Sequence, residues 1–120
     1  MIEYKFTSFD ILAGGIILGL ENDGKILGFL DVYFAPDGHE AELRAIYILK
    51  SEHGKGIGRQ FLGRLFGELI EKKYKNLAVY VLDKNPSRYF YETMGAKFVS
   101  EEDASVYGTD LKEWRYEWDL

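Results

Sequence analysis

Residues 49–59 read Leu49-Lys50-Ser51-Glu52-His53-Gly54-Lys55-Gly56-Ile57-Gly58-Arg59, and this stretch is the most informative part of the chain. An apolar run at residues 43–49 leads into it, and a strongly periodic apolar pattern follows it. The glycines let backbone N–H groups turn toward a common point without interference from Cβ atoms. The first N–H groups of the helix that follows have no internal partner and lie at its positive dipole end. We therefore predict an anion site between a strand and a helix, best suited to a pyrophosphate.

The helix is predicted from residue 57 onward. Apolar residues recur there at steps of three and four: Ile57, Phe61, Leu62, Leu65, Phe66, Leu69 and Ile70. Gly63 and Gly67 are four residues apart, so they share a face that we expect to pack closely on a sheet or a ligand. Residues 77–82 are apolar on both faces, which is typical of a central strand covered on both sides. Strand, turn, helix and strand make a βαβ unit with parallel strands.

The segments around this unit favour further strands. Asp23-Gly24 between two apolar runs predicts a hairpin whose second strand ends at Pro36. Alternating apolar residues predict other strands at about residues 2–6, 40–49, 96–106 and 111–118, and a short helix is expected at 87–94 before Gly95. The expected fold class is α/β (α+β), with a mixed, mostly antiparallel central sheet and a parallel βαβ core.

Composition restricts the class of protein. The 120 residues, 47% hydrophobic and 16% aromatic, fit one folded domain spanning residues 1–120. Without cysteine there is no thiolate nucleophile and no cysteine-held zinc, and two histidines argue against a histidine-rich cluster, so we expect no metal. The sequence shows neither a leader pattern nor an apolar run long enough to span a bilayer. We expect a cytoplasmic protein with no membrane partner.

Charge is informative in its distribution. The net charge of −5 argues against nucleic acid as a partner. Residues 50–64, however, carry Lys50, Lys55, Arg59 and Arg64 against Glu52 alone. A basic island on a glycine turn suits a small polyanion, whereas the alternative is that these charges only solvate a helix face.

A second motif lies downstream and reads Asn85-Pro86-Ser87-Arg88-Tyr89-Phe90-Tyr91-Glu92-Thr93-Met94-Gly95-Ala96. The glycine turn matches neither the P-loop nor the G-x-G-x-x-G pattern. Residues 53–58 instead resemble R/Q-x-x-G-x-G/A, the pyrophosphate loop of the GNAT superfamily of N-acetyltransferases. The second motif resembles that family's downstream Asn…Phe-Tyr-Glu-x-x-Gly segment. The resemblance covers roughly residues 16–120 and implies the GNAT acyl-CoA N-acyltransferase fold.

The resemblance also implies an activity and a site. It implies acetyl-CoA as cosubstrate and direct acetyl transfer to a primary amine of an unidentified small molecule or protein. Tyr91 would be the general acid that protonates the leaving thiolate, which suits a hydroxyl with an ordinary pKa of about 10; the alternative is an aromatic core residue. Asn85 would hydrogen-bond the pantetheine arm. The remaining coenzyme contacts implied are the backbone of Ile46, Tyr47 and Ile48 along the arm, and His53, Gly54, Lys55, Gly56, Ile57, Gly58 and Arg59 around the pyrophosphate.

Two further assignments carry open alternatives. By simple alternation Glu42 faces the same side as Ile46 and Ile48, so it is the candidate base, acting through water. Its alternative is a surface partner for Arg44 or Lys25. His53 stands where the family usually has Arg or Gln, and its alternative is no direct role.

The N-terminal segment departs from the family pattern. Family members usually have a strand and two helices before the strand that resembles residues 16–20, and residues 1–15 are too few for both helices. Those helices wall the acceptor site in the family. We therefore expect an acceptor side that is open or covered by a second subunit, and hence a homodimer. The rival functions are a non-catalytic acyl-CoA-binding or interaction module, and a scaffold without ligand.

Overall fold

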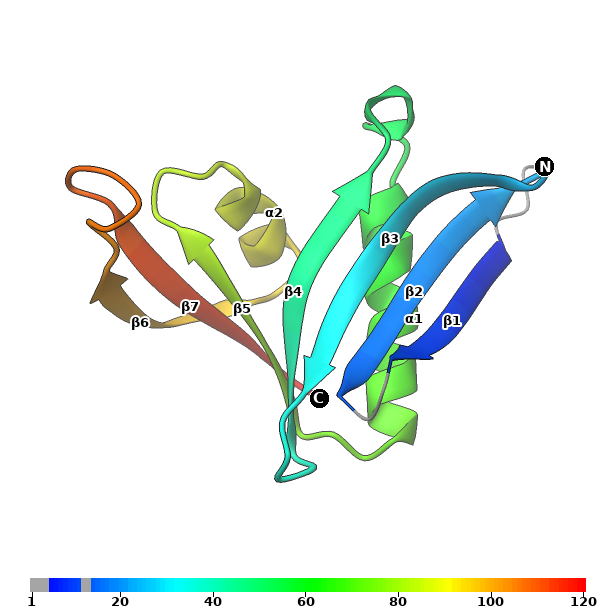
Figure 1. Cartoon of the computed structure of the whole chain (residues 1–120), viewed down its shortest axis with the longest axis horizontal. Helices are drawn as coiled ribbons and strands as arrows, with labels where there is room; N and C mark the ends of the chain where they lie inside the picture. Colours follow the sequence, from blue (N-terminus) through cyan, green and yellow to red (C-terminus); the bar gives the residue numbers. More distant parts are fainter. Residues whose placement is uncertain (1–4, 12–13) are drawn as a thin grey trace.

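The computed structural model describes residues 5–11 and 14–120. One sheet holds seven strands in the order β1-β2-β3-β4-β5-β7-β6 (Figure 1). In chain order the elements are β1 (Lys5–Ile11), β2 (Gly15–Asn22), β3 (Lys25–Phe34), β4 (Glu40–Ile48), a 3₁₀ turn (Lys50–Glu52), α1 (Ile57–Glu71), β5 (Asn76–Leu82), α2 (Ser87–Thr93), β6 (Lys97–Asp103) and β7 (Lys112–Asp119). All neighbours are antiparallel except β4 and β5. The expected fold class is confirmed.

The β2–β3 hairpin forms as expected. Asn22 pairs with Lys25, and the two turn residues Asp23 and Gly24 have φ of 51° and 76°. Positive φ at both positions is what a two-residue hairpin turn requires. The N-terminal strand differs from the expectation because β1 runs from Lys5 to Ile11 rather than over residues 2–6. Residues 2–4 of that expectation lie outside the described residues.

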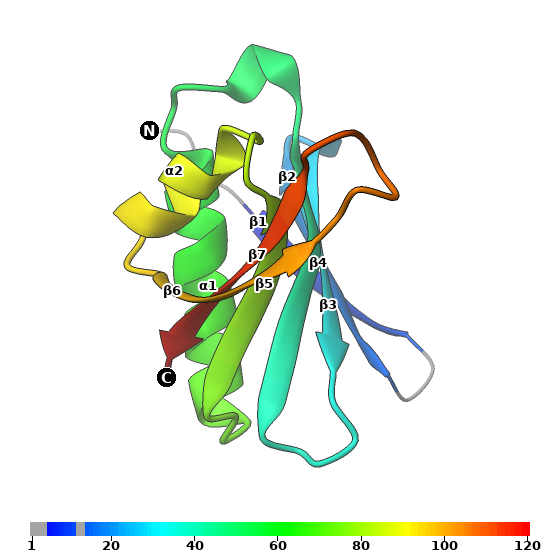
Figure 2. The ribbon, with the colours of Figure 1, turned by 90° about the vertical axis from the view of Figure 1, so that its left-hand side faces the viewer.

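Both helices lie on one face of the sheet (Figure 2). The Trp118 ring contacts Phe66 of α1 and Tyr91 of α2, with ring centroids 5.6 and 5.9 Å apart, so it joins the two helices over one core. Among the described residues, helices therefore cover β5 on one side only, and on its other side Ala78 is buried whereas Tyr80 is exposed, so the expectation of cover on both sides holds only in part. Successive right-handed crossovers that move in the same direction along a sheet place their helices on the same face. No helix among the described residues covers the other face, which we call the open face, and none is long and apolar enough to cross a bilayer.

Long polar side chains cover β5 on the open face. Arg115 bonds to Glu40, to Glu117 at 3.3 Å and to the Tyr80 hydroxyl. Asn76 donates to the same two carboxylates at 3.0 and 2.7 Å. Burial alone would lower the pKa of Arg115, but its bonds to Glu117, Glu40 and Tyr80 outweigh burial and raise it. Each charged group of this network therefore has a partner within it.

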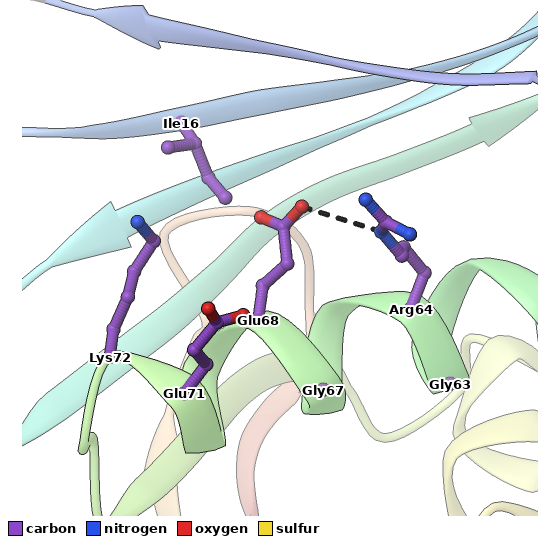
Figure 3. A pocket seen from close by; sticks show the side chains of 7 residues that line it. All are labelled: Ile16, Gly63, Arg64, Gly67, Glu68, Glu71 and Lys72. Atoms are coloured by element: carbon purple, nitrogen blue, oxygen red, sulfur yellow. Dashed lines mark hydrogen bonds and ion pairs between the residues drawn. The ribbon is translucent and has the colours of Figure 1, made fainter.

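Gly63 and Gly67 do not pack against the sheet. Both are exposed, and a Cβ at either position would meet nothing within 4 Å. They line an open groove of about 800 Å³ along α1, in which Arg64 and Glu68 form an ion pair at 3.4 Å (Figure 3). The expectation of close packing on the sheet is wrong, because the apolar stripe of α1 turns these glycines to solvent, and packing on a ligand stays a prediction.

Tyr116 predicts how stability responds to alkaline pH. Burial, followed by its hydrogen bond to Glu92 at 2.6 Å, raises the pKa of Tyr116 to about 12. The native state then holds a proton that the unfolded chain releases above its ordinary pKa of about 10. This contribution is complete below pH 10 and is lost as the pH rises toward 12. Tyr116→Phe should lower the free energy of unfolding by about 1 kcal/mol at pH 7 and flatten its fall above pH 10. Urea titrations between pH 7 and 11.5 measure both effects, and parallel curves would contradict them.

Candidate active site

The site begins where two parallel strands separate. β4 and β5 pair only from Glu40–Asn76 to Leu43–Val79 and then diverge (Figure 1). Two cavities occupy this region. One, of about 530 Å³, lies beside the glycine loop on the helix side, and we call it the loop-side cavity. The other, of about 400 Å³, lies toward the open face, and we call it the open-side cavity. Ile46, Ser87 and Tyr91 line both cavities, so the two meet at these residues.

The glycine loop presents backbone donors to the loop-side cavity. Gly54 and Gly56 have φ of 81° and 76°, which favours glycine, and Gly56 is the N-cap of α1 without any side-chain cap. The first intrahelical bond runs from the Gln60 N–H to the Gly56 carbonyl at 3.2 Å. The N–H groups of residues 57–59 therefore have no partner in the helix. Free donors at the positive end of a 15-residue helix suit a polyanion.

The polar side chains around the glycine loop differ in whether they already have a partner. His53 Nε2 donates to the Ile48 carbonyl at 2.9 Å, so this ring ties the loop to the end of β4. Lys55 pairs with Glu52 at 3.0 Å. Arg59 lines the cavity and has no ion pair or hydrogen bond to another described residue. Among the described residues that line this cavity, Arg59 is thus an unpaired cation available for an anion.

The other residues predicted to bind the coenzyme or an anion do not all lie at the loop-side cavity. Ile46 and Ile48 line the loop-side cavity, whereas the Tyr47 side chain is 51% exposed and contacts Phe29 on the open face. Arg64 belongs to the groove on α1 and not to the basic island at the loop. Among the described residues, no group of acidic or histidine side chains could hold a metal ion.

Gly58 sets the distance between the loop and the second motif. A Cβ at this position would lie 2.9 Å from Cζ of Phe90, closer than real Cβ contacts allow. The first turn of α1 therefore packs directly on α2, which holds Tyr91 next to the glycine loop. Sequence reasoning missed Phe90, although its place beside Tyr91 in the second motif marked it for α2.

Tyr91 has the properties of a proton donor. It is 7% exposed, contacts Trp118 edge-on and lines both cavities. Its hydroxyl forms no hydrogen bond with a described residue. Every fully buried polar side-chain atom among the described residues has a partner, so the Tyr91 hydroxyl oxygen is not fully buried and is accessible from the cavities. Burial raises the pKa of Tyr91 above its ordinary value. The phenol therefore keeps its proton at neutral and mildly alkaline pH.

Asn85 has a structural task as well. Its Oδ1 accepts the Ser87 N–H at 2.9 Å, which satisfies a free donor at the start of α2. The residue lines the open-side cavity rather than the loop-side one. Its Nδ2 group has no hydrogen-bond partner among the described residues, so it remains as a donor for the predicted bond to the pantetheine arm.

Glu42 does not lie where alternation along the strand placed it. Val32 pairs with Leu43 and Asp31 with Ala45, which leaves Arg44 as an extra, unpaired residue in β4. A bulge of this kind reverses the side to which the following residues point. Glu42 therefore faces the opposite side from Ile46 and Ile48, and the expectation of a shared face is wrong. Glu42 lines neither of the two cavities.

Sequence reasoning missed the residues that line the open-side cavity, namely Arg44, Tyr80, Tyr107 and Glu113. Only Glu113 had a usable signal, because β7 alternates aromatic and charged residues and Glu113 faces away from Trp114. The other three positions depend on the bulge, on the exposed face of β5 and on the loop before β7.

Comparison with known proteins identifies the family. The model of the acetyltransferase (GNAT) family matches residues 2–96. The chain therefore belongs to the GNAT acetyltransferase family, as its two motifs indicated.

Individual relatives agree with this assignment. The uncharacterised N-acetyltransferase YuaI of Bacillus subtilis (strain 168) is 29% identical over 109 residues, which is 87% of this chain and 62% of that protein. The [ribosomal protein bS18]-alanine N-acetyltransferase of Haemophilus influenzae is 36% identical over 78 residues, which is 65% of this chain and 52% of that protein. The chain thus spans less than two thirds of the length of either relative. A GNAT family acetyltransferase from Elizabethkingia anophelis with acetyl-CoA bound has a TM-score of 0.83 at 13% identity over 98% of each chain, and supports the fold.

Proposed function

We propose that this protein is an acetyl-CoA-dependent N-acetyltransferase that transfers the acetyl group directly to a primary amine. The observation that carries the proposal is the junction of the two cavities at Tyr91. The loop-side cavity has free backbone donors and Arg59 for a diphosphate. The open-side cavity gives an amine a way to reach Tyr91. The cosubstrate is taken from the family and fits this set of donors.

The described residues support each part of the transfer. The N–H groups at 57–59 and the Arg59 side chain hold the diphosphate, and Ile46 and Ile48 flank the arm that leads to Tyr91. An amine entering from the open-side cavity attacks the thioester carbonyl near Ile46 and Ser87. Tyr91 protonates the thiolate that leaves, because burial keeps its phenol in the protonated form.

A thiol-release assay tests the activity. Wild-type protein with acetyl-CoA and a broad panel of primary amines should release free coenzyme A only when an accepted amine is present. Binding of acetyl-CoA without thiol release over the whole panel would support the non-catalytic acyl-CoA-binding module instead. Absence of binding would contradict both functions.

We propose in addition that the protein acts as a homodimer. Phe29 and Tyr47 are exposed as a ring pair on the open face, with centroids 5.7 Å apart, and a second copy would cover them. Sedimentation equilibrium should give twice the monomer mass of 13.8 kDa. Tyr47→Lys should shift the protein toward the monomer, and a wild-type monomer at all concentrations would contradict the proposal.

A further inference from the structure

The open-side cavity is lined by two charges of opposite sign. Arg44 comes from the bulge in β4, and Glu113 comes from β7, opposite Leu82 of β5. The other lining residues are neutral: Ile46, Tyr80, Val81, Leu82, Asn85, Ser87, Tyr91 and Tyr107. A ligand in this cavity therefore meets one guanidinium and one carboxylate.

Both of these charges are unpaired within the described residues. Arg44 lies over the Tyr33 ring, 5.4 Å from its centroid, and makes no ion pair there. Glu113 has no hydrogen bond or ion pair to any described residue. The nearby charges of Glu40, Arg115 and Glu117 behave differently, because both carboxylates pair with the same guanidinium. Arg44 and Glu113 are therefore the charged residues that line this cavity, and neither has an ion-pair partner among the described residues.

A ligand that fills the cavity displaces water from the parts of Arg44 and Glu113 that line it. A charge that loses part of its water without gaining a partner lowers the affinity for the ligand. An amine without an anionic group would pair with Glu113 and leave Arg44 without a partner. A molecule with an ammonium and an anionic group satisfies both, and a guanidinium donates two parallel hydrogen bonds to a carboxylate or a phosphate.

We propose that the acceptor is a small amine that also carries an anionic group, with its ammonium on Glu113 and its anionic group on Arg44. The inference rests on the proposed function and assigns its substrate class. A cavity of about 400 Å³ accommodates a molecule of amino acid size.

The assignment gives Glu113 a part in the chemistry. One ammonium proton passes to Glu113, and the neutral amine forms the bond to the acetyl carbon. The carbon–sulfur bond then breaks, and the thiolate takes the phenolic proton of Tyr91. The new amide nitrogen loses its second proton, which returns through water to Tyr91, while Glu113 releases its proton to solvent. The products are an amide, free coenzyme A and one proton.

Matched amines test the substrate class. The pairs are β-alanine with β-alaninamide and O-phosphoethanolamine with ethanolamine, and their kcat/KM values are measured by thiol release. At least one anionic member should exceed its neutral counterpart by about tenfold or more, and the pair that shows it distinguishes carboxylate from phosphate. Arg44→Gln should abolish that preference, whereas Lys84→Gln, which removes an exposed charge outside the cavity lining, should keep it.

A second pair of variants tests Glu113. Glu113→Gln should lower kcat/KM about 100-fold for every accepted amine and leave coenzyme A binding unchanged. Glu102→Gln removes the carboxylate directly opposite on β6, which does not line the cavity, and should retain activity. Three outcomes would overturn the inference while the acetyltransferase function stands. The first is equal rates for both members of each pair, and the second is faster acetylation of a peptide amide with an N-terminal alanine. The third is loss of activity in Glu42→Gln but not in Glu113→Gln. Bound coenzyme A without turnover of any amine would overturn the function as well.

Discussion

Tyr91→Phe should slow acetyl transfer by about 100-fold, since a positioned general acid typically contributes at least that much. The change removes only the hydroxyl, and the ring keeps its contacts with Phe90 and Trp118. The hydroxyl bonds to no described residue, so the fold should lose little stability. The Kd for acetyl-CoA should stay nearly constant, because the diphosphate donors lie on the loop. Single-turnover rates and calorimetric titration separate the two effects.

Tyr89→Phe is the matched control for this experiment. Tyr89 lies on the same helix, is exposed and accepts a hydrogen bond from Arg88 at 2.8 Å outside both cavities. Its variant should transfer acetyl groups at the wild-type rate. Because burial raises the pKa of Tyr91, the wild-type rate should rise with pH as the amine deprotonates, and should not fall before pH 10. An unchanged rate in Tyr91→Phe would remove Tyr91 as the acid.

Gly56→Ala should weaken coenzyme A binding by roughly tenfold. Gly56 has φ of 76°, and an L-residue costs about 1–2 kcal/mol in this left-handed region. A Cβ there meets nothing within 4 Å, so the strain is in the backbone and not in packing. Relief of this strain turns the N–H groups of residues 57–59 away from a common point, and a lost bond to a charged group costs about 1.5–3 kcal/mol. Calorimetric titration with coenzyme A measures the change in Kd.

Gly38→Ala supplies the matched control for backbone strain. Gly38 has φ of 73° and also has open space around its Cβ position. It lies in the β3–β4 turn, at the opposite end of the sheet from the glycine loop (Figure 1). Both variants should lose similar stability in urea, but only Gly56→Ala should lose coenzyme A affinity. Equal affinities in the two variants would contradict the role of the loop.

Features that depend on local sequence were predictable. The Asp23-Gly24 turn, the start of α1 after Gly56 and the end of α2 before Gly95 follow from backbone preferences of a few residues. The βαβ unit followed from the change of apolar period between residues 43–49 and 57–70. The two motifs brought the loop and Tyr91 together because that unit joins them.

Features that depend on pairing between strands were not predictable. The bulge at Arg44 arises from the register of β3 against β4, and it reversed the face assigned to Glu42. The open face of β5 follows from both crossovers lying on one side, which the apolar run at 77–82 does not reveal. Arg44 and Glu113 are 69 positions apart in sequence (113 minus 44) and share a cavity only through the sheet order.

Backbone amide shifts on coenzyme A titration give the most direct test of diphosphate binding by the loop. In ¹H–¹⁵N spectra of the wild-type chain, the largest shifts should fall on residues 54–59, with smaller ones along Ile46 and Ile48. The turn at Gly38 should not respond. A spectrum that ignores coenzyme A, or shifts concentrated in the groove along α1, would contradict the site proposed for the glycine loop.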